Sequence, residues 1–136
     1  MIIKVTDGDH FDVWVCDDYV IKKPKEPHVK DVAVLNRIAD IQTELSGKVK
    51  GVLPCKRIGM ALIMPKAPGL RGDEVDEVTW ETKVKPLRDE IVAEIKQLGY
   101  TLPDWGNARN IFYDGEAGQV YIVDFHSAFK NRLKEG

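Results

Sequence analysis

The sequence predicts an α+β fold in a single domain of 136 residues. Three observations indicate it: β-branched and aromatic runs at the start, two stretches with apolar residues at helical spacing, and two strand-like runs near the end. With 43% hydrophobic and 31% charged residues, the composition is that of an ordinary globular domain with a modest core.

The first half predicts five strands around one helix. The runs IIKV, VWVC and YVIK, separated by Asp and Gly, favour an antiparallel meander that ends at a Pro-containing segment. Between His28 and Leu45 apolar residues recur at helical spacing, and Gly47 follows as a stop. Two further strand-like runs, VLPCKRIG and MALIMPK, meet at Gly59. We therefore expect an antiparallel sheet with one helix.

The second half begins at the segment APGLRG, residues 67–72, which is typical of a hinge. The acidic run DEVDEV then favours the start of a short helix, because negative charge stabilises a helix N-terminus. Residues Val84 to Leu98 predict an amphipathic helix that ends at Gly99. The segment TLPDWGNARN is expected to be a loop, and NIFYD and VYIVDF predict a hairpin across DGEAG.

Composition also excludes some classes of function. A formal net charge of −2 argues against a nucleic-acid binder that works by bulk charge. The longest apolar runs are far shorter than the roughly 18–20 residues that span a bilayer, and no signal peptide is apparent at the start. Cys16 and Cys55 lie in separate apolar runs and are expected to be buried free thiols. We expect a cytoplasmic protein that does not bind membranes.

The predicted hairpin carries a pattern typical of a magnesium site. Asn110 comes just before its first strand, and Asp124 follows its second strand fourteen residues later. Mg²⁺ prefers hard oxygen ligands and commonly takes one or two protein oxygens together with phosphates and water. A hairpin would hold this amide and this carboxylate at one edge, although each residue alone could equally be a loop cap or a turn residue.

The order of elements and four local stretches resemble the protein-kinase-like fold, especially its small, divergent branches, the RIO-type kinases and aminoglycoside phosphotransferases. NIFYDGEAGQVYIVDFHSA is similar to that family's catalytic-loop Asn, a hairpin, and a strand ending in the metal-binding Asp-Phe pair. The resemblance implies that Asn110 and Asp124 bind metal and that the cofactors are ATP and Mg²⁺.

Two further stretches carry the resemblance. YVIKKPK is similar to the family's third strand, and its Lys22 would reach the α- and β-phosphates. The strand period sends Val20 and Lys22 to one face and Lys23 to the other. Asp104 lies five residues after Gly99, where the family has the catalytic Asp that orients the acceptor hydroxyl, although the loop from Asp104 to the metal-binding Asn is one residue longer than usual.

The stretch ALIMPKAPG looks like the strand and hinge that receive adenine in this family. Met64 would lie at the back of the pocket, and backbone groups near Lys66 and Ala67 would bind the base. A carboxylate from the first helix holds the phosphate-binding Lys in the family. Asp40 and Glu44 are both candidates here, and pairing with Arg37 or Lys48 on the helix surface is the alternative for either.

The resemblance implies one kinase-like domain with an N-lobe at residues 1–66, a hinge at 67–72 and a much reduced C-lobe at 73–136. The departures are a loop, TDGDHFDVW, with only Gly8 where the family is Gly-rich, His126 in place of the metal motif's final Gly, and an end twelve residues after Asp124. Two hypotheses follow: an ATP/Mg²⁺-dependent phosphotransferase with an unnamed phosphoryl acceptor, or an inactive kinase-like module that binds or regulates a protein partner.

Overall fold

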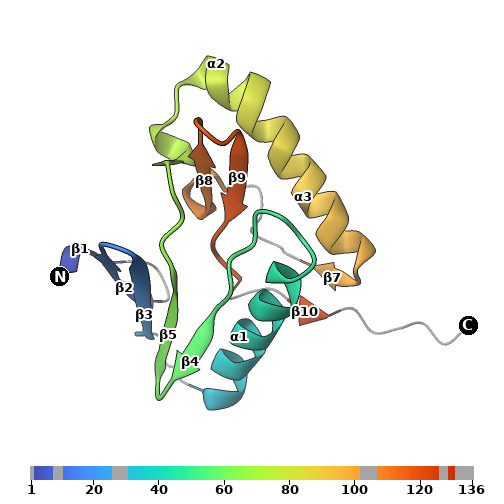
Figure 1. The fold of residues 1–136 in the computed structure, drawn as a ribbon. Coiled ribbons are helices and arrows are strands. Elements are labelled where there is room, and N and C mark those ends of the chain that lie inside the picture. The colour runs from blue at the N-terminus through green and yellow to red at the C-terminus, as the bar shows by residue number, and fades with distance from the viewer. Residues whose placement is uncertain (1, 8–10, 26–30, 102–106, 126–128, 131–136) are drawn as a thin grey trace, which may run out of the picture.

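The computed structural model describes residues 2–7, 11–25, 31–101, 107–125 and 129–130. Within these ranges the α+β prediction is confirmed, because antiparallel sheets combine with a few helices (Figure 1). The largest sheet has the strand order β1-β2-β3-β5-β4, and every neighbouring pair is antiparallel. Its strands are β1 (Ile2–Asp7), β2 (Phe11–Cys16), β3 (Tyr19–Pro24), β4 (Lys56–Ile58) and β5 (Ala61–Pro65).

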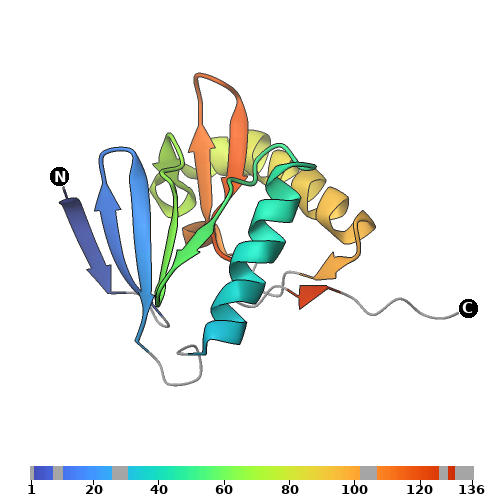
Figure 2. The same ribbon diagram turned by 60° about the horizontal axis from the view of Figure 1, so that its bottom comes forward.

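Helix α1 (Val32–Ser46) lies alongside β4 and β5 (Figures 1 and 2). Asp31 caps its N-terminus by accepting a hydrogen bond from the Ala33 N–H at 2.8 Å, and Gly47 follows its last residue as the sequence predicts. The predicted start at His28 lies outside the described residues. The helix buries one face: Leu35, Ile38, Ala39, Ile41, Gln42 and Leu45.

The predicted hairpin is present as β8 (Ile111–Asp114) and β9 (Gln119–Ile122). A short strand that the sequence pattern did not predict, β6 (Leu70–Arg71), pairs with β8 and makes a three-stranded sheet. This strand lies inside the segment expected to be a hinge. Its pairing depends on a partner more than forty residues away, and local turn chemistry carries no signal for such a partner.

Helix α3 (Lys85–Gln97) matches the amphipathic helix predicted over residues 84–98 and packs on β9. The acidic run before it forms η2 (Gly72–Glu74) and the single turn α2 (Glu77–Thr79), and η3 (Trp80–Val84), a π-helical turn, joins α2 to α3. The segment expected to be a loop, residues 101–110, begins at the second residue of β7 (Tyr100–Thr101), which pairs with β10 (Phe129–Lys130), and ends with the 3₁₀ turn η4 (Ala108–Asn110).

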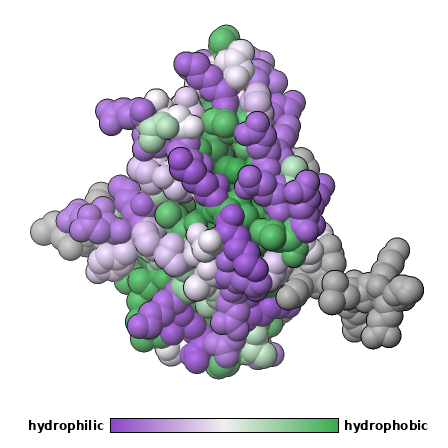
Figure 3. Space-filling model, turned by 45° about the vertical axis from the view of Figure 1, so that its right-hand side comes forward, coloured by the Kyte–Doolittle hydropathy of each residue, from purple (hydrophilic) through white to green (hydrophobic). Residues whose placement is uncertain are grey.

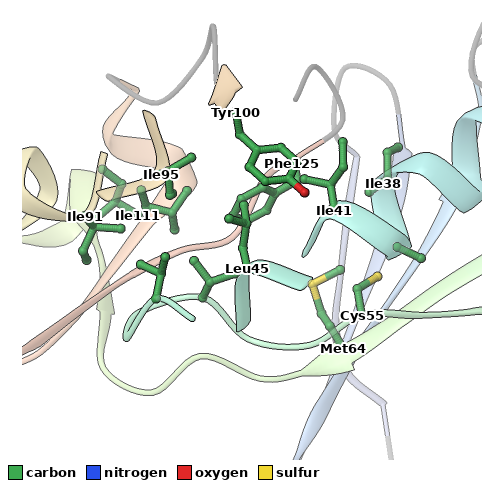
Figure 4. Packing of buried hydrophobic residues seen from close by; sticks show 14 of the residues in the cluster. Ile38, Ile41, Leu45, Cys55, Met64, Ile91, Ile95, Tyr100, Ile111 and Phe125 are labelled. Atoms are coloured by element: carbon green, nitrogen blue, oxygen red, sulfur yellow. The ribbon is translucent and has the colours of Figure 1, made fainter. Parts of the chain in front are cut away.

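One apolar cluster joins the two halves of the chain. Tyr100 and Phe125 are almost fully buried in it, with Ile41 and Leu45 from α1 beside them (Figure 4).

Cys16 and Cys55 are buried free thiols, as the sequence predicts, and burial raises the pKa of Cys55 to about 11. On the face shown in Figure 3, a strip of hydrophobic surface runs between hydrophilic side chains. Among the described residues, no helix is long and apolar enough to cross a membrane.

Gly69 lets β6 approach β8 closely. Its φ is +92°, and a Cβ there would lie 2.0 Å from the carbonyl oxygen of Tyr113. We expect Gly69→Ala to lower the free energy of unfolding by about 2–3 kcal/mol, because it combines backbone strain with a steric clash. Chemical denaturation would measure this effect.

Gly118 provides the matched control for that substitution. It also has a positive φ, +63°, but nothing lies within 4 Å of the position that a Cβ would take, so Gly118→Ala should cost only about 1 kcal/mol of backbone strain. Equal losses for the two variants would contradict the close packing of β6 on β8.

Candidate functional site

Lys22 lies near the end of β3 and faces the core side of the sheet. Its cross-strand neighbours are Val13 and Leu62, while Val20, two residues earlier, pairs with the buried Met64. Lys23 lies 5.6 Å from the centre of the Trp14 ring, consistent with its position on the opposite face. The Lys22 ammonium therefore points toward the second half of the molecule, and its Nζ donates a hydrogen bond to the carbonyl oxygen of Val123 at 3.0 Å.

Asn110 and Asp124 flank the open end of the β8–β9 hairpin. Asn110 ends η4, which is held by a hydrogen bond from its own N–H to the Asn107 carbonyl at 2.9 Å. The Val123 N–H donates to the Asn110 carbonyl at 2.9 Å, and Asp124 is the next residue. The peptide groups of Val123 thus connect Asn110 on one side and Lys22 on the other, directly beside Asp124.

Buried neighbours fix the polar residues at this position. Ile111 follows Asn110 and pairs with Ile122, and both side chains are almost completely buried. Phe125, directly after Asp124, is 2% exposed in the same core. Because successive strand residues point in alternating directions, burial of these apolar residues leaves Asn110 and Asp124 only partly covered.

The segment that follows α1 connects the large sheet to the hairpin. The Ile122 N–H donates to the carbonyl oxygen of Gly51 at 3.0 Å, and Val49 and Val52 on either side are buried. A second contact holds α1 near β4: the Thr43 hydroxyl donates to the carbonyl of Cys55, the residue just before β4. We infer that these two contacts help to set the distance between the large sheet and the hairpin, and hence between Lys22 and Asp124.

The residues expected to receive a base lie at the end of β5 and just after it. Met64 is 5% exposed, and Ala67 is also buried, whereas Lys66 is exposed. The Lys66 N–H donates to the carbonyl oxygen of Asp18 at 3.0 Å, so this donor is already used within the protein.

Sequence reasoning missed Gln42 as a residue next to Met64. Gln42 is 1% exposed, and its amide Nε2 donates to the Leu53 carbonyl at 2.9 Å and lies 3.6 Å from the Met64 sulfur. The signal that could have found it is a polar residue on the apolar face of α1. Gln42 thereby links the helix to the back of the expected base pocket.

The contacts described for Glu44 are with two other partners. The Tyr100 hydroxyl donates to one carboxylate oxygen, and Lys48 forms an i, i+4 ion pair with the other at 3.2 Å. Burial, followed by the hydrogen bond to Glu44, raises the pKa of Tyr100 to about 12. Asp40 is exposed and lies with Glu44 and Tyr100 along one shallow groove. These contacts do not choose between Asp40 and Glu44, so pairing of Lys22 with either carboxylate stays a prediction.

The structure brings Lys22, Asn110 and Asp124 together, but it does not describe every predicted site residue. Asp104, His126 and Gly8 lie outside the described residues. Among the residues that are described, no group of three His, Cys, Asp or Glu side chains could hold a metal by itself. Metal binding by the Asn110 amide and the Asp124 carboxylate therefore stays a prediction.

Comparison with known proteins supports the fold. No protein-family model matches the chain, and a comparison with curated proteins finds no match. Among the solved structures that match is that of Rio2 kinase from Chaetomium thermophilum in an ADP/Mg²⁺-phosphoaspartate complex, with a TM-score of 0.73 and 14% sequence identity. The similarity covers 93% of this chain and 48% of the Rio2 chain, so this chain spans about half the length of its neighbour. The molecule therefore has a protein-kinase-like fold.

Proposed function

We propose that this chain binds ATP with Mg²⁺ and transfers its terminal phosphoryl group to an acceptor. The observation that carries the proposal is the hydrogen bond from Lys22 to the Val123 carbonyl. This bond links a cation on β3 to the hairpin end that carries Asn110 and Asp124. Kinases use such a combination, a Lys for the phosphates together with an Asp and an Asn for Mg²⁺.

The residues present fit Mg²⁺. An amide oxygen from Asn110 and a carboxylate oxygen from Asp124 are hard ligands, and two protein ligands leave room for phosphate oxygens and water. When bound, Mg²⁺ would neutralise charge on the phosphates. The ADP/Mg²⁺ in the Rio2 structure supports the same cofactors for this chain, as an analogy of fold.

Lys22 would release the Val123 carbonyl and bind the α- and β-phosphates, with Asp40 or Glu44 holding its ammonium. The base would lie against Val20, Met64 and Ile122, between a proposed N-lobe at residues 1–66 and a reduced C-lobe at 73–136, joined by residues 67–72. Because the Lys66 N–H is used by Asp18, the base would be read by the Lys66 carbonyl and the Ala67 N–H.

Asp104 would accept a hydrogen bond from the acceptor hydroxyl and orient it for attack.

One feature of the sequence favours a second candidate function, a kinase-like module that binds nucleotide or a protein without catalysis. The loop between β1 and β2 has only Gly8, beside Asp7 and Asp9, where close approach of backbone N–H groups to phosphate favours several glycines.

Thermal unfolding with ATP, with and without Mg²⁺, tests nucleotide binding. A ligand that binds only the folded state stabilises it by about 2.7 kcal/mol at a concentration of 100 Kd. We expect ATP with Mg²⁺ to raise Tm by several degrees and ATP alone to raise it less. No change at millimolar ATP would exclude phosphoryl transfer from ATP and nucleotide binding by an inactive module, and would leave only a module that binds a protein.

A further inference from the structure

A second surface lies at the other end of the β8–β9 hairpin, away from Asn110 and Asp124. There the hairpin turn faces the segment that contains β6, η2 and α2 (Figure 1), and the two enclose a groove of about 730 Å³. Leu70, Val75 and Tyr113 supply apolar side chains to this groove. None of the residues proposed to bind nucleotide or metal lines it.

The groove concentrates negative charge. Its lining contains four carboxylates and no Lys, Arg or His: Glu74, Asp76, Asp114 and Glu116. The nearby Arg71 is engaged with Asp73 in an ion pair of 2.6 Å. Since the whole chain carries a formal charge of only −2, the lining of this groove is far more acidic than the average surface.

Three of these carboxylates are held in place by the protein. Asp76 accepts hydrogen bonds from the Thr79 N–H and hydroxyl at 2.9 and 2.8 Å, and these bonds hold the pKa of Asp76 below its ordinary value. Glu74 accepts from the Arg71 N–H at 3.0 Å, and Asp114 accepts from the Glu116 N–H at 3.2 Å. A cationic partner would therefore meet charges that lose little side-chain freedom on binding.

A large apolar side chain is exposed in the same groove. Leu70 lines the groove and is 54% exposed, beside the groove residues Val75 and Tyr113. Exposed apolar side chains rimmed by fixed charges of one sign are typical of a surface that binds a partner of the opposite sign.

We propose that this groove, lined by residues 68–79 and 113–116, docks a segment of another protein in which lysines or arginines flank large apolar side chains. The basic side chains would meet the carboxylate rim, and an apolar side chain would cover Leu70. The charge of the rim opposes a nucleic acid, whose phosphates would be repelled.

The test uses a short fluorescein-labelled peptide in which lysines flank two leucines, with fluorescence anisotropy at physiological salt. We expect saturable binding that weakens about tenfold for Leu70→Ser and for Glu116→Gln, both of which line the groove. Leu98→Ser and Glu90→Gln, at exposed positions of α3 and just beyond it, are matched controls and should leave the affinity unchanged.

Three results would overturn the proposal. The first is no binding to the wild type, and the second is equal binding of a peptide whose leucines are replaced by serine. The third is a change in oligomeric state of the groove variants by light scattering, which would identify a second copy of this chain as the occupant. Because no residue that lines the groove is proposed to bind nucleotide or metal, none of these results depends on ATP.

Discussion

Asp104→Asn should reduce phosphoryl transfer by about 10²–10⁴-fold while leaving ATP affinity nearly unchanged. The expected loss is that of a residue which positions the acceptor hydroxyl and takes its proton in the transition state. Asn keeps the size of the side chain but cannot accept a proton. Transfer of labelled γ-phosphate to acceptor candidates, or to the chain itself, would measure the rate.

The comparison between binding and turnover decides which of the two candidate functions holds. A variant that binds ATP as the wild type does but has lost transfer supports catalysis through Asp104. If the wild type binds ATP and Mg²⁺ but shows the same background rate as the variant, the chain is a binding module and the catalytic assignment is wrong.

Asp124→Asn should reduce transfer by at least about a hundredfold and also remove the Mg²⁺ dependence of ATP binding. The physical reason is the loss of the only anionic metal ligand in the proposed pair, which corresponds to about 2.7 kcal/mol at the rate-limiting step. Titration of ATP with and without Mg²⁺ would separate the loss of metal from a loss of nucleotide.

Asp114→Asn is the matched control on the same hairpin. Asp114 lies at the turn end and accepts hydrogen bonds from the N–H groups of Glu116 and Ala117, which an Asn oxygen can also accept. We expect this variant to retain transfer and Mg²⁺-dependent binding. Equal losses for both variants would indicate damage to the hairpin instead of to a metal site.

The elements that the sequence predicts well are those with strong local patterns. Helix α3 has apolar residues at helical spacing and a Gly after its end, and the hairpin has a turn of Asp and Gly between β-branched runs. Strand β6 and the β7–β10 pair have two residues per strand, too few to show any period. They form because distant strands offer hydrogen-bond partners, and this information is not local.

The same distinction applies to the candidate site. Lys22, Asn110 and Asp124 could be selected from sequence because their side chains are of the types that the proposed chemistry needs. The group that brings them together is the Val123 backbone, and a peptide group leaves no trace in sequence. Nor could sequence spacing show that Tyr100, 56 residues away, bonds to Glu44, one of the two carboxylates considered for Lys22.

The most direct test of the Lys22 site is ATP affinity in Lys22→Met and Lys23→Met, measured by calorimetric titration with Mg²⁺. The two residues are adjacent, but Lys22 reaches the Val123 carbonyl while Lys23 lies over Trp14 on the other face of the sheet. We predict that Kd rises about tenfold or more for Lys22→Met, equivalent to at least about 1.4 kcal/mol, and stays unchanged for Lys23→Met. Equal affinities in the two variants would contradict the proposed site.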